Sequence, residues 1–149
     1  MGALCVAKAG LMAGIIMGII AMMLNMMKVT TLDLTQYIGC MLTGQKSGAV
    51  SMAAGLVVHL IMSVVFAFIY VWIAEYLAIP LSPTNGALFG LIHSIIGGIM
   101  MPLMDSMNNC VSKSKVKAMR MFAQGHDSAG TITYFGIHIL YGALLAMFL

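Results

Sequence analysis

Four long apolar stretches, separated by short polar segments, constrain the fold of this chain more than any other feature. They cover approximately residues 9–27, 50–73, 85–104 and 131–148. Each is close to the roughly 20 residues that an α-helix needs to cross the hydrocarbon core of a bilayer. Only 7% of the 149 residues are charged, whereas a soluble domain carries about 25%. The sequence therefore predicts an all-α protein with a single transmembrane domain, a four-helix bundle surrounded by the lipid bilayer.

The basic residues gather in two of the connecting segments, 28–49 and 105–130. Lysine and arginine mark the cytoplasmic side of a membrane protein, so we expect both segments inside and both chain termini outside. The basic residues follow no pattern of base-stacking aromatics, and nucleic acid is not an expected partner. Those in the two segments are Lys28, Lys46, Lys113, Lys115, Lys117 and Arg120.

Each basic segment is expected to hold a short interfacial helix. In the first, Thr31 is available as a cap and Gly44 as a stop, which are typical helix boundary signals. The apolar residues between them recur at helical spacing: Leu34, Ile38, Met41 and Leu42. The second has an apolar face opposite its lysines, formed by Val116, Met119 and Phe122. A basic amphipathic helix of this kind favours anionic lipid, and the same surface is open to a protein partner.

The three cysteines, Cys5, Cys40 and Cys110, lie far apart in the sequence. An odd number without C-x-x-C spacing indicates neither a disulfide framework nor a zinc site. On the cytoplasmic side, where Cys40 and Cys110 are expected, thiols stay reduced. We therefore expect unpaired cysteines.

Small residues recur every fourth position in all four stretches, and the pattern occurs twice. An offset of 76 residues relates Gly10 to Gly86, and an offset of 79 relates His59 to His138. Such small-xxx-small series let membrane helices pack closely. We therefore expect two similar hairpins, each a span, an interfacial helix and a second span. The glycines expected at helix contacts are Gly10, Gly14, Gly18, Gly55, Gly86, Gly90 and Gly142.

Three histidines lie inside the apolar stretches: His59, His93 and His138. Under the repeat, His93 corresponds to Met17. At about 1.5 Å per residue from the helix ends nearest the basic segments, all four lie at a depth of about 13 to 16 Å. Ionisable residues at such depth mark functional sites, and imidazole and thioether are ligands for copper or haem iron. The alternative is that each histidine only donates a hydrogen bond to a neighbouring helix.

Methionine is the second unusual feature, with 17 residues. Pairs four residues apart resemble the M-x-x-x-M spacing of copper-uptake channels, although those have three spans and methionine-rich extracellular tails that are absent from this sequence. Methionine as a pliable apolar filler is the favoured interpretation. The pairs are Met22–Met26, Met23–Met27 and Met100–Met104.

With Gly55-x-x-x-His59, Gly90-x-x-His93 and Gly136-x-His138, the chain resembles small four-helix inner-membrane proteins of bacteria. That resemblance implies a bacterial inner membrane and no particular activity. The first hypothesis is a protein that binds haem b or copper through the three histidines and Met17, as an accessory or electron-transfer subunit of a larger membrane complex. The alternatives are a cofactor-free structural subunit that docks or self-associates by its glycine faces, and a proton or metal-ion channel or transporter. We expect no catalytic activity of the chain on its own.

Overall fold

A computed structural model describes residues 2–149 as an all-α protein. Four helices are long and apolar enough to cross a membrane: α1 (Ala3–Met26), α3 (Ala49–Tyr76), α4 (Pro83–Met107) and α6 (Ser128–Phe148). Each contains its predicted apolar stretch to within one residue. The prediction of an all-α membrane bundle is therefore confirmed.

The first basic segment contains the expected interfacial helix, α2 (Leu34–Thr43). Gly44 ends it in the left-handed conformation, with φ of 70°, as a C-terminal glycine commonly does. The N-cap is Asp33 rather than Thr31, because the Asp33 carboxylate accepts the Gln36 N–H at 2.8 Å. The sequence thus predicted this helix and its stop, but not its cap.

The amphipathic helix expected in the second basic segment is not formed. Between α4 and α6 the chain has only the short α5 (Asn109–Ser112) and a 3₁₀ turn, η1 (Met121–Ala123). The Asp105 carboxylate explains part of the difference, since it accepts the N–H groups of Met119 at 2.9 Å and Arg120 at 2.7 Å. Those donors are satisfied without the carbonyl groups of a helix.

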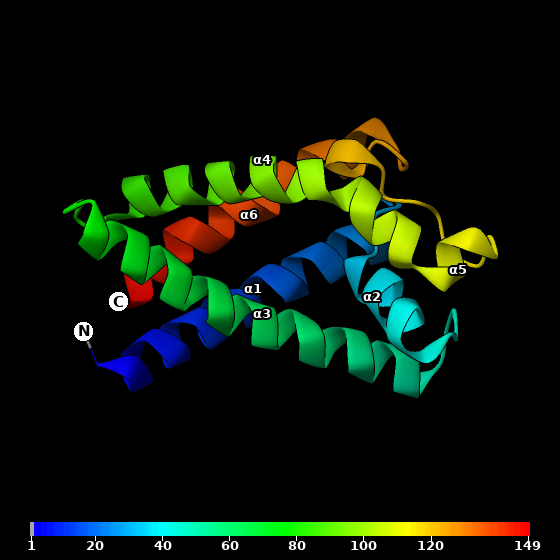
Figure 1. Cartoon of the computed structure of the whole chain (residues 1–149), viewed down its shortest axis with the longest axis horizontal. Helices are drawn as coiled ribbons and strands as arrows, with labels where there is room; N and C mark the ends of the chain where they lie inside the picture. Colours follow the sequence, from blue (N-terminus) through cyan, green and yellow to red (C-terminus); the bar gives the residue numbers. More distant parts are fainter. Residues whose placement is uncertain (1) are drawn as a thin grey trace.

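Figure 1 shows the four long helices running along one direction. The two chain termini and the α3–α4 turn lie at one end, and α2 and α5 lie at the other. Helix α1 packs against α3, α4 packs against α6, and α1 and α6 join the two pairs. The pairs α1–α3 and α4–α6 correspond to the two predicted hairpins, which we call hairpin one and hairpin two.

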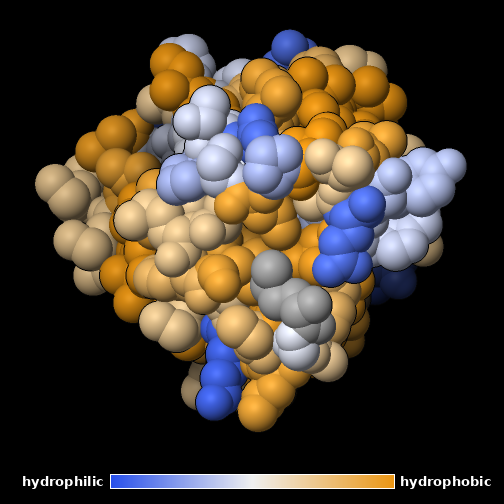
Figure 2. All heavy atoms as spheres, turned by 90° about the vertical axis from the view of Figure 1, so that its left-hand side faces the viewer, coloured by the Kyte–Doolittle hydropathy of each residue, from blue (hydrophilic) through white to orange (hydrophobic). Residues whose placement is uncertain are grey.

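The outer surface is that of a protein in lipid. Figure 2, a view onto the end that carries the termini, shows apolar atoms over most of this face, with small separate hydrophilic patches. Large apolar side chains point outward from the spans, for example Ile61 at 55% and Ile96 at 59% exposure. Continuous apolar exposure on this scale requires a lipid environment.

Hairpin two is held by direct contact between backbones. A Cβ added to Gly142 would collide with the carbonyl oxygen of Gly86, and one added to Gly86 would collide with that of Gly142. At Gly90 the obstructing atom is the carbonyl oxygen of His138. Only glycine permits α4 and α6 to lie this close together.

In hairpin one, glycines mostly face side chains. A Cβ on Gly10 would lie 2.6 Å from the Ala67 Cβ, and Gly14 lies against the Ser63 side chain. Gly18 faces His59, where a Cβ would lie 3.2 Å from Nε2. Gly55 is the exception, because it packs on the backbone of α2 rather than on α1. The similar small-residue patterns therefore give two different kinds of contact.

The expectation of unpaired cysteines is wrong for two of the three. Cys40 at the end of α2 and Cys110 in α5 form a disulfide, with their Cα atoms 6.0 Å apart. Seventy residues separate them in the sequence, and only the folding of the two basic segments onto each other brings them together. Cys5 remains free and exposed.

Candidate functional site

The three histidines and Met17 line one cavity of about 110 Å³ inside the membrane-spanning part of the bundle. The four side chains come from all four spans, His59 from α3, His93 from α4, His138 from α6 and Met17 from α1. Residues of α2 close the cavity toward the loop end. We call this space the histidine cavity, and its other lining residues are Leu34, Ile38, Met62, Ser63, Phe66 and Tyr141.

Two of the histidines are oriented by backbone carbonyl groups. His59 Nε2 lies 3.1 Å from the carbonyl oxygen of Gly14, and His138 Nδ1 lies 2.6 Å from that of Tyr134. A carbonyl oxygen only accepts, so each of these ring nitrogens carries the proton. The other nitrogen of each neutral ring then holds a lone pair. Within residues 2–149 that second nitrogen has no hydrogen-bond partner.

His93 closes the gap between α3 and α4. Its Nδ1 lies 3.1 Å from the Tyr70 hydroxyl, and its ring centroid lies 3.8 Å from that of Phe66. On the other side the ring meets His138 edge to face, with 4.9 Å between centroids. His93 therefore connects α3, α4 and α6 at one level of the bundle.

Among residues 2–149, no three His, Cys, Asp or Glu side chains are arranged as the ligands of a metal ion. In His59 and His138 one ring nitrogen is engaged by Gly14 or Tyr134, so only the other nitrogen of each ring is open to a ligand. The present geometry thus satisfies the hydrogen-bonding interpretation of the histidines. Metal binding requires the free ring nitrogens to converge on one point in the cavity that they share.

A second cavity, of about 230 Å³, adjoins the first and extends toward the loop end. The two cavities share Met17, Leu34 and His59. We call this second space the methionine cavity, because Met22 and Met26 line it together with Met17 and Met52.

Only one of the predicted M-x-x-x-M pairs lines a cavity. Met22 and Met26 line the methionine cavity, although they are as exposed as Met23 and Met27, at 50% and 73% against 53% and 69%. In α4, Met100 is 48% exposed and lines neither cavity. The outward-facing pairs are what a lipid-facing apolar filler predicts.

The polar residues at the loop end hold the structure together. Tyr37 donates its hydroxyl to Asp105 at 2.8 Å, and burial together with this hydrogen bond raises the pKa of Tyr37. Asp127 caps α6 through the Gly130 N–H at 2.6 Å and accepts the Thr31 N–H at 3.0 Å. Partial desolvation raises the pKa of Asp127, but these hydrogen bonds outweigh it and leave the pKa lowered.

Sequence reasoning did not single out the aromatic residues around the histidine cavity. Tyr70 contacts His93, and Tyr141 donates its hydroxyl to the carbonyl oxygen of Ser63. The available signal was a tyrosine inside an apolar stretch, since a phenol group at that depth needs a partner. Comparison with protein families, curated proteins and solved structures gives no match for this chain.

Proposed function

We propose that this membrane protein binds one copper(I) ion in the histidine cavity, through His59, His93, His138 and Met17. The observation that carries the proposal is that these four side chains, one from each span, line a single small cavity. All four ligands are neutral; the thioether is a soft ligand that selects copper(I), and imidazole is a common copper ligand.

The size and charge of the cavity favour copper(I) over other cofactors. Its volume of about 110 Å³ is well below the roughly 300–1,000 Å³ of small-molecule sites, and haem b needs a space of that larger class. Four neutral ligands leave the full charge of the ion inside the membrane. Buried charge is expensive there, so a monovalent ion is easier to hold than a divalent one.

The tautomers of two histidines also support metal binding. A metal-bound histidine usually donates its other ring N–H to a carbonyl group or carboxylate. His59 and His138 both make such a bond, to Gly14 and Tyr134. Small shifts that bring the free ring nitrogens to one point, with these hydrogen bonds kept, are then the change that binding requires.

The proposed role is that of an accessory or electron-transfer subunit within a larger membrane complex. Because the chain consists almost wholly of membrane spans, it has little surface on which to bind soluble proteins. A cofactor buried between the spans is consistent with a role inside a membrane complex. The methionine cavity supplies an access route for copper from the loop end, since Met22 and Met26 line it. Thioether side chains bind copper(I) in preference to harder ions.

We further propose a location in the bacterial inner membrane, with the basic loops in the cytoplasm and both termini outside. The distribution of lysine supports this orientation. The Cys40–Cys110 disulfide is the opposing observation, because cytosolic thiols are kept reduced. Because Cys40 and Cys110 are buried, the orientation is tested by labelling the exposed position Ser47→Cys, in a Cys5→Ser background, with an impermeant maleimide in intact cells: protection supports it and modification contradicts it.

The two alternative functions have different support. A cofactor-free subunit that docks by its glycine faces is disfavoured, because Gly10, Gly14, Gly86 and Gly142 lie against helices of the same chain. A metal-ion channel is favoured by the methionine cavity, which adjoins the histidine cavity. It requires an exit on the other side of the histidines.

Copper content of the full-length protein, purified in detergent under reducing conditions, tests the proposal. We expect about one copper(I) per chain, and less than about a tenth of that in His59→Ala and His138→Ala. Met17→Leu should weaken binding, while Met147→Leu, a matched change at a lipid-exposed position, should not. A copper-free wild type, or full copper content in both histidine variants, would contradict the proposal. Copper flux into liposomes without a stably bound ion would favour the channel.

A further inference from the structure

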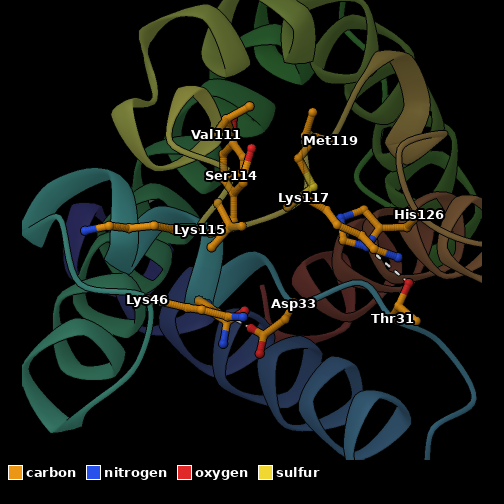
Figure 3. Close-up of a pocket in the computed structure, with 13 residues that line it drawn as sticks. Thr31, Asp33, Lys46, Val111, Ser114, Lys115, Lys117, Met119 and His126 are labelled. Atoms are coloured by element: carbon orange, nitrogen blue, oxygen red, sulfur yellow. Dashed lines mark hydrogen bonds between the residues drawn. The ribbon is translucent and has the colours of Figure 1, made fainter.

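A third cavity, of about 590 Å³, lies at the loop end outside the membrane-spanning helices. We call it the loop cavity. It is bounded by α2 on one side and by the chain between α5 and η1 on the other, as Figure 3 shows. Its volume is in the range of about 300–1,000 Å³ that is typical of small-molecule sites.

Three lysines line the loop cavity, Lys46, Lys115 and Lys117, against a single acidic residue, Asp33. None of the three forms an ion pair in the part of the chain that the structure describes. Lys115 donates to the carbonyl oxygen of Gly44 at 2.6 Å and extends away from the other two in Figure 3. Lys46 and Lys117 therefore contribute positive charge that the single Asp33 carboxylate in the lining does not balance.

His126 adds a second, independent feature. Its Nδ1 lies 3.2 Å from the Thr31 hydroxyl, and its Nε2 is buried without a hydrogen-bond partner. When the Thr31 hydroxyl donates to Nδ1, Nε2 carries the proton and requires an acceptor. Nε2 is closed off from solvent in this structure, but the His126 side chain lines the loop cavity, so a turn of the imidazole brings the Nε2–H within reach of a ligand oxygen that would satisfy it.

We propose that the loop cavity binds a phosphate group through the ammonium groups of Lys46 and Lys117 and through the His126 Nε2–H. Lysine is a common phosphate ligand because its ammonium group acts as a point charge with three donors. The cavity lies where the spans end, at the level of lipid headgroups. The phosphate can therefore belong to an anionic phospholipid or to a soluble compound, and the two sources share the same recognition chemistry.

The test uses full-length protein purified in a neutral detergent, with two double variants of equal charge. Lys46→Gln/Lys117→Gln removes the two cavity lysines. Lys8→Gln/Lys113→Gln removes two that do not line the cavity. Binding is measured for inorganic phosphate by calorimetry, and for phosphatidylglycerol against diacylglycerol by native mass spectrometry.

We expect the cavity variant to bind phosphatidylglycerol about 10- to 30-fold more weakly than the wild type, at about 1 kcal/mol per lysine. The control should change by less than about twofold, and diacylglycerol should bind neither. If inorganic phosphate also binds and displaces the lipid, the source is soluble; if only the lipid binds, it is a headgroup. Either result supports the proposal.

Two results would overturn the phosphate site. One is that neither phosphate nor phosphatidylglycerol binds the wild type. The other is that both double variants lose affinity equally, which would mean that net charge rather than the cavity attracts the ligand. A further comparison isolates His126: His126→Ala should weaken binding about three- to tenfold, and Thr31→Val should do so less. Copper content should stay unchanged in Lys117→Gln alone, because Lys117 lines neither the histidine cavity nor the methionine cavity, so failure here is distinct from failure of the copper proposal.

Discussion

The two hairpins are built on similar sequence patterns but packed in different ways. In hairpin two, the backbones of α4 and α6 touch at Gly86 and Gly142. In hairpin one, α1 and α3 are spaced by side chains, with Ala67 against Gly10 and Ser63 against Gly14. Helix α2 then packs closely on α3 at Gly55.

This difference explains where the cavities lie. The methionine cavity is lined mainly by α1, α2 and α3 and their connecting segments, which form the more loosely packed half of the molecule. In hairpin two the backbones of α4 and α6 touch instead. The same pattern of small residues thus gives one helix pair in backbone contact and one pair spaced by side chains, depending on which atoms face each glycine.

The largest expected effect comes from separating the two halves at the loop end. The disulfide between Cys40 and Cys110 joins α2 of hairpin one to α5 of hairpin two. Cys40→Ser should lower the free energy of unfolding by about 3 kcal/mol. Without the disulfide the unfolded chain gains conformational entropy, because the segment between residues 40 and 110 is no longer closed into a loop. Denaturant titration under non-reducing conditions measures the change. Cys5→Ser is the control and should be neutral; equal stability of both variants would show that the bond is absent in the native protein.

The next effect tests the tight backbone contact of hairpin two. Gly142→Ala should destabilise the protein by about 2 kcal/mol, since the new methyl group meets the carbonyl oxygen of Gly86 and the helices must move apart. Gly136 lies on the same helix with nothing within 4 Å of an added Cβ. Gly136→Ala should therefore be neutral or stabilising by up to about 1 kcal/mol. Equal melting temperatures for the two variants in detergent would argue against the close crossing.

A smaller effect is expected in hairpin one, where the obstruction can be removed. Gly10→Ala should destabilise by about 1 kcal/mol, because its methyl group would lie 2.6 Å from the Ala67 Cβ. The double variant Gly10→Ala/Ala67→Gly should recover at least half of that loss. In hairpin two, Gly86→Ala/Ala146→Gly should recover little, because the Gly142 carbonyl oxygen still obstructs the added methyl group after the Ala146 Cβ at 2.9 Å is removed. Recovery in both hairpins, or in neither, would remove the distinction between them.

The smallest effect concerns pH and a second link between the halves. Asp127 caps α6 and accepts the Thr31 N–H from hairpin one. Its folded-state pKa is lowered, so its contribution to stability is present at neutral pH and is lost as pH falls below about 4. The melting temperature should therefore fall on acidification. Asp127→Asn keeps a capping oxygen but does not titrate, so its melting temperature should depend less on pH below about 4. If the pH dependence of the melting temperature is unchanged in this variant, other carboxylates cause it.

The sequence was sufficient for the architecture because the bilayer imposes it. Apolar length predicted the four spans, and the recurrence of Gly10 at Gly86 predicted the paired hairpins. Local signals also predicted α2 and its end at Gly44. The helix expected after Lys113 does not form, because the backbone N–H groups of Met119 and Arg120 donate to the Asp105 carboxylate. Amphipathic spacing in the sequence does not reveal this contact.

The site was predictable in part, because helices that cross a bilayer place each residue at a depth that can be calculated from the sequence. Helical rise placed Met17 and the three histidines at one depth, and the cavity that they line is consistent with that estimate. Which ring nitrogen is engaged, and by which carbonyl, depends on helix rotation and was not predictable. The pairing of Cys40 with Cys110 and the contact of Tyr70 with His93 likewise depend on tertiary packing between distant segments.

X-ray absorption spectroscopy of the copper(I)-loaded protein tests the central proposal most directly. We predict a first shell of imidazole nitrogens with one sulfur, the sulfur contribution lost in Met17→Leu and the imidazole scattering reduced in His138→Ala. A shell of sulfur alone, or a spectrum that is unchanged by both substitutions, would contradict copper binding in the histidine cavity.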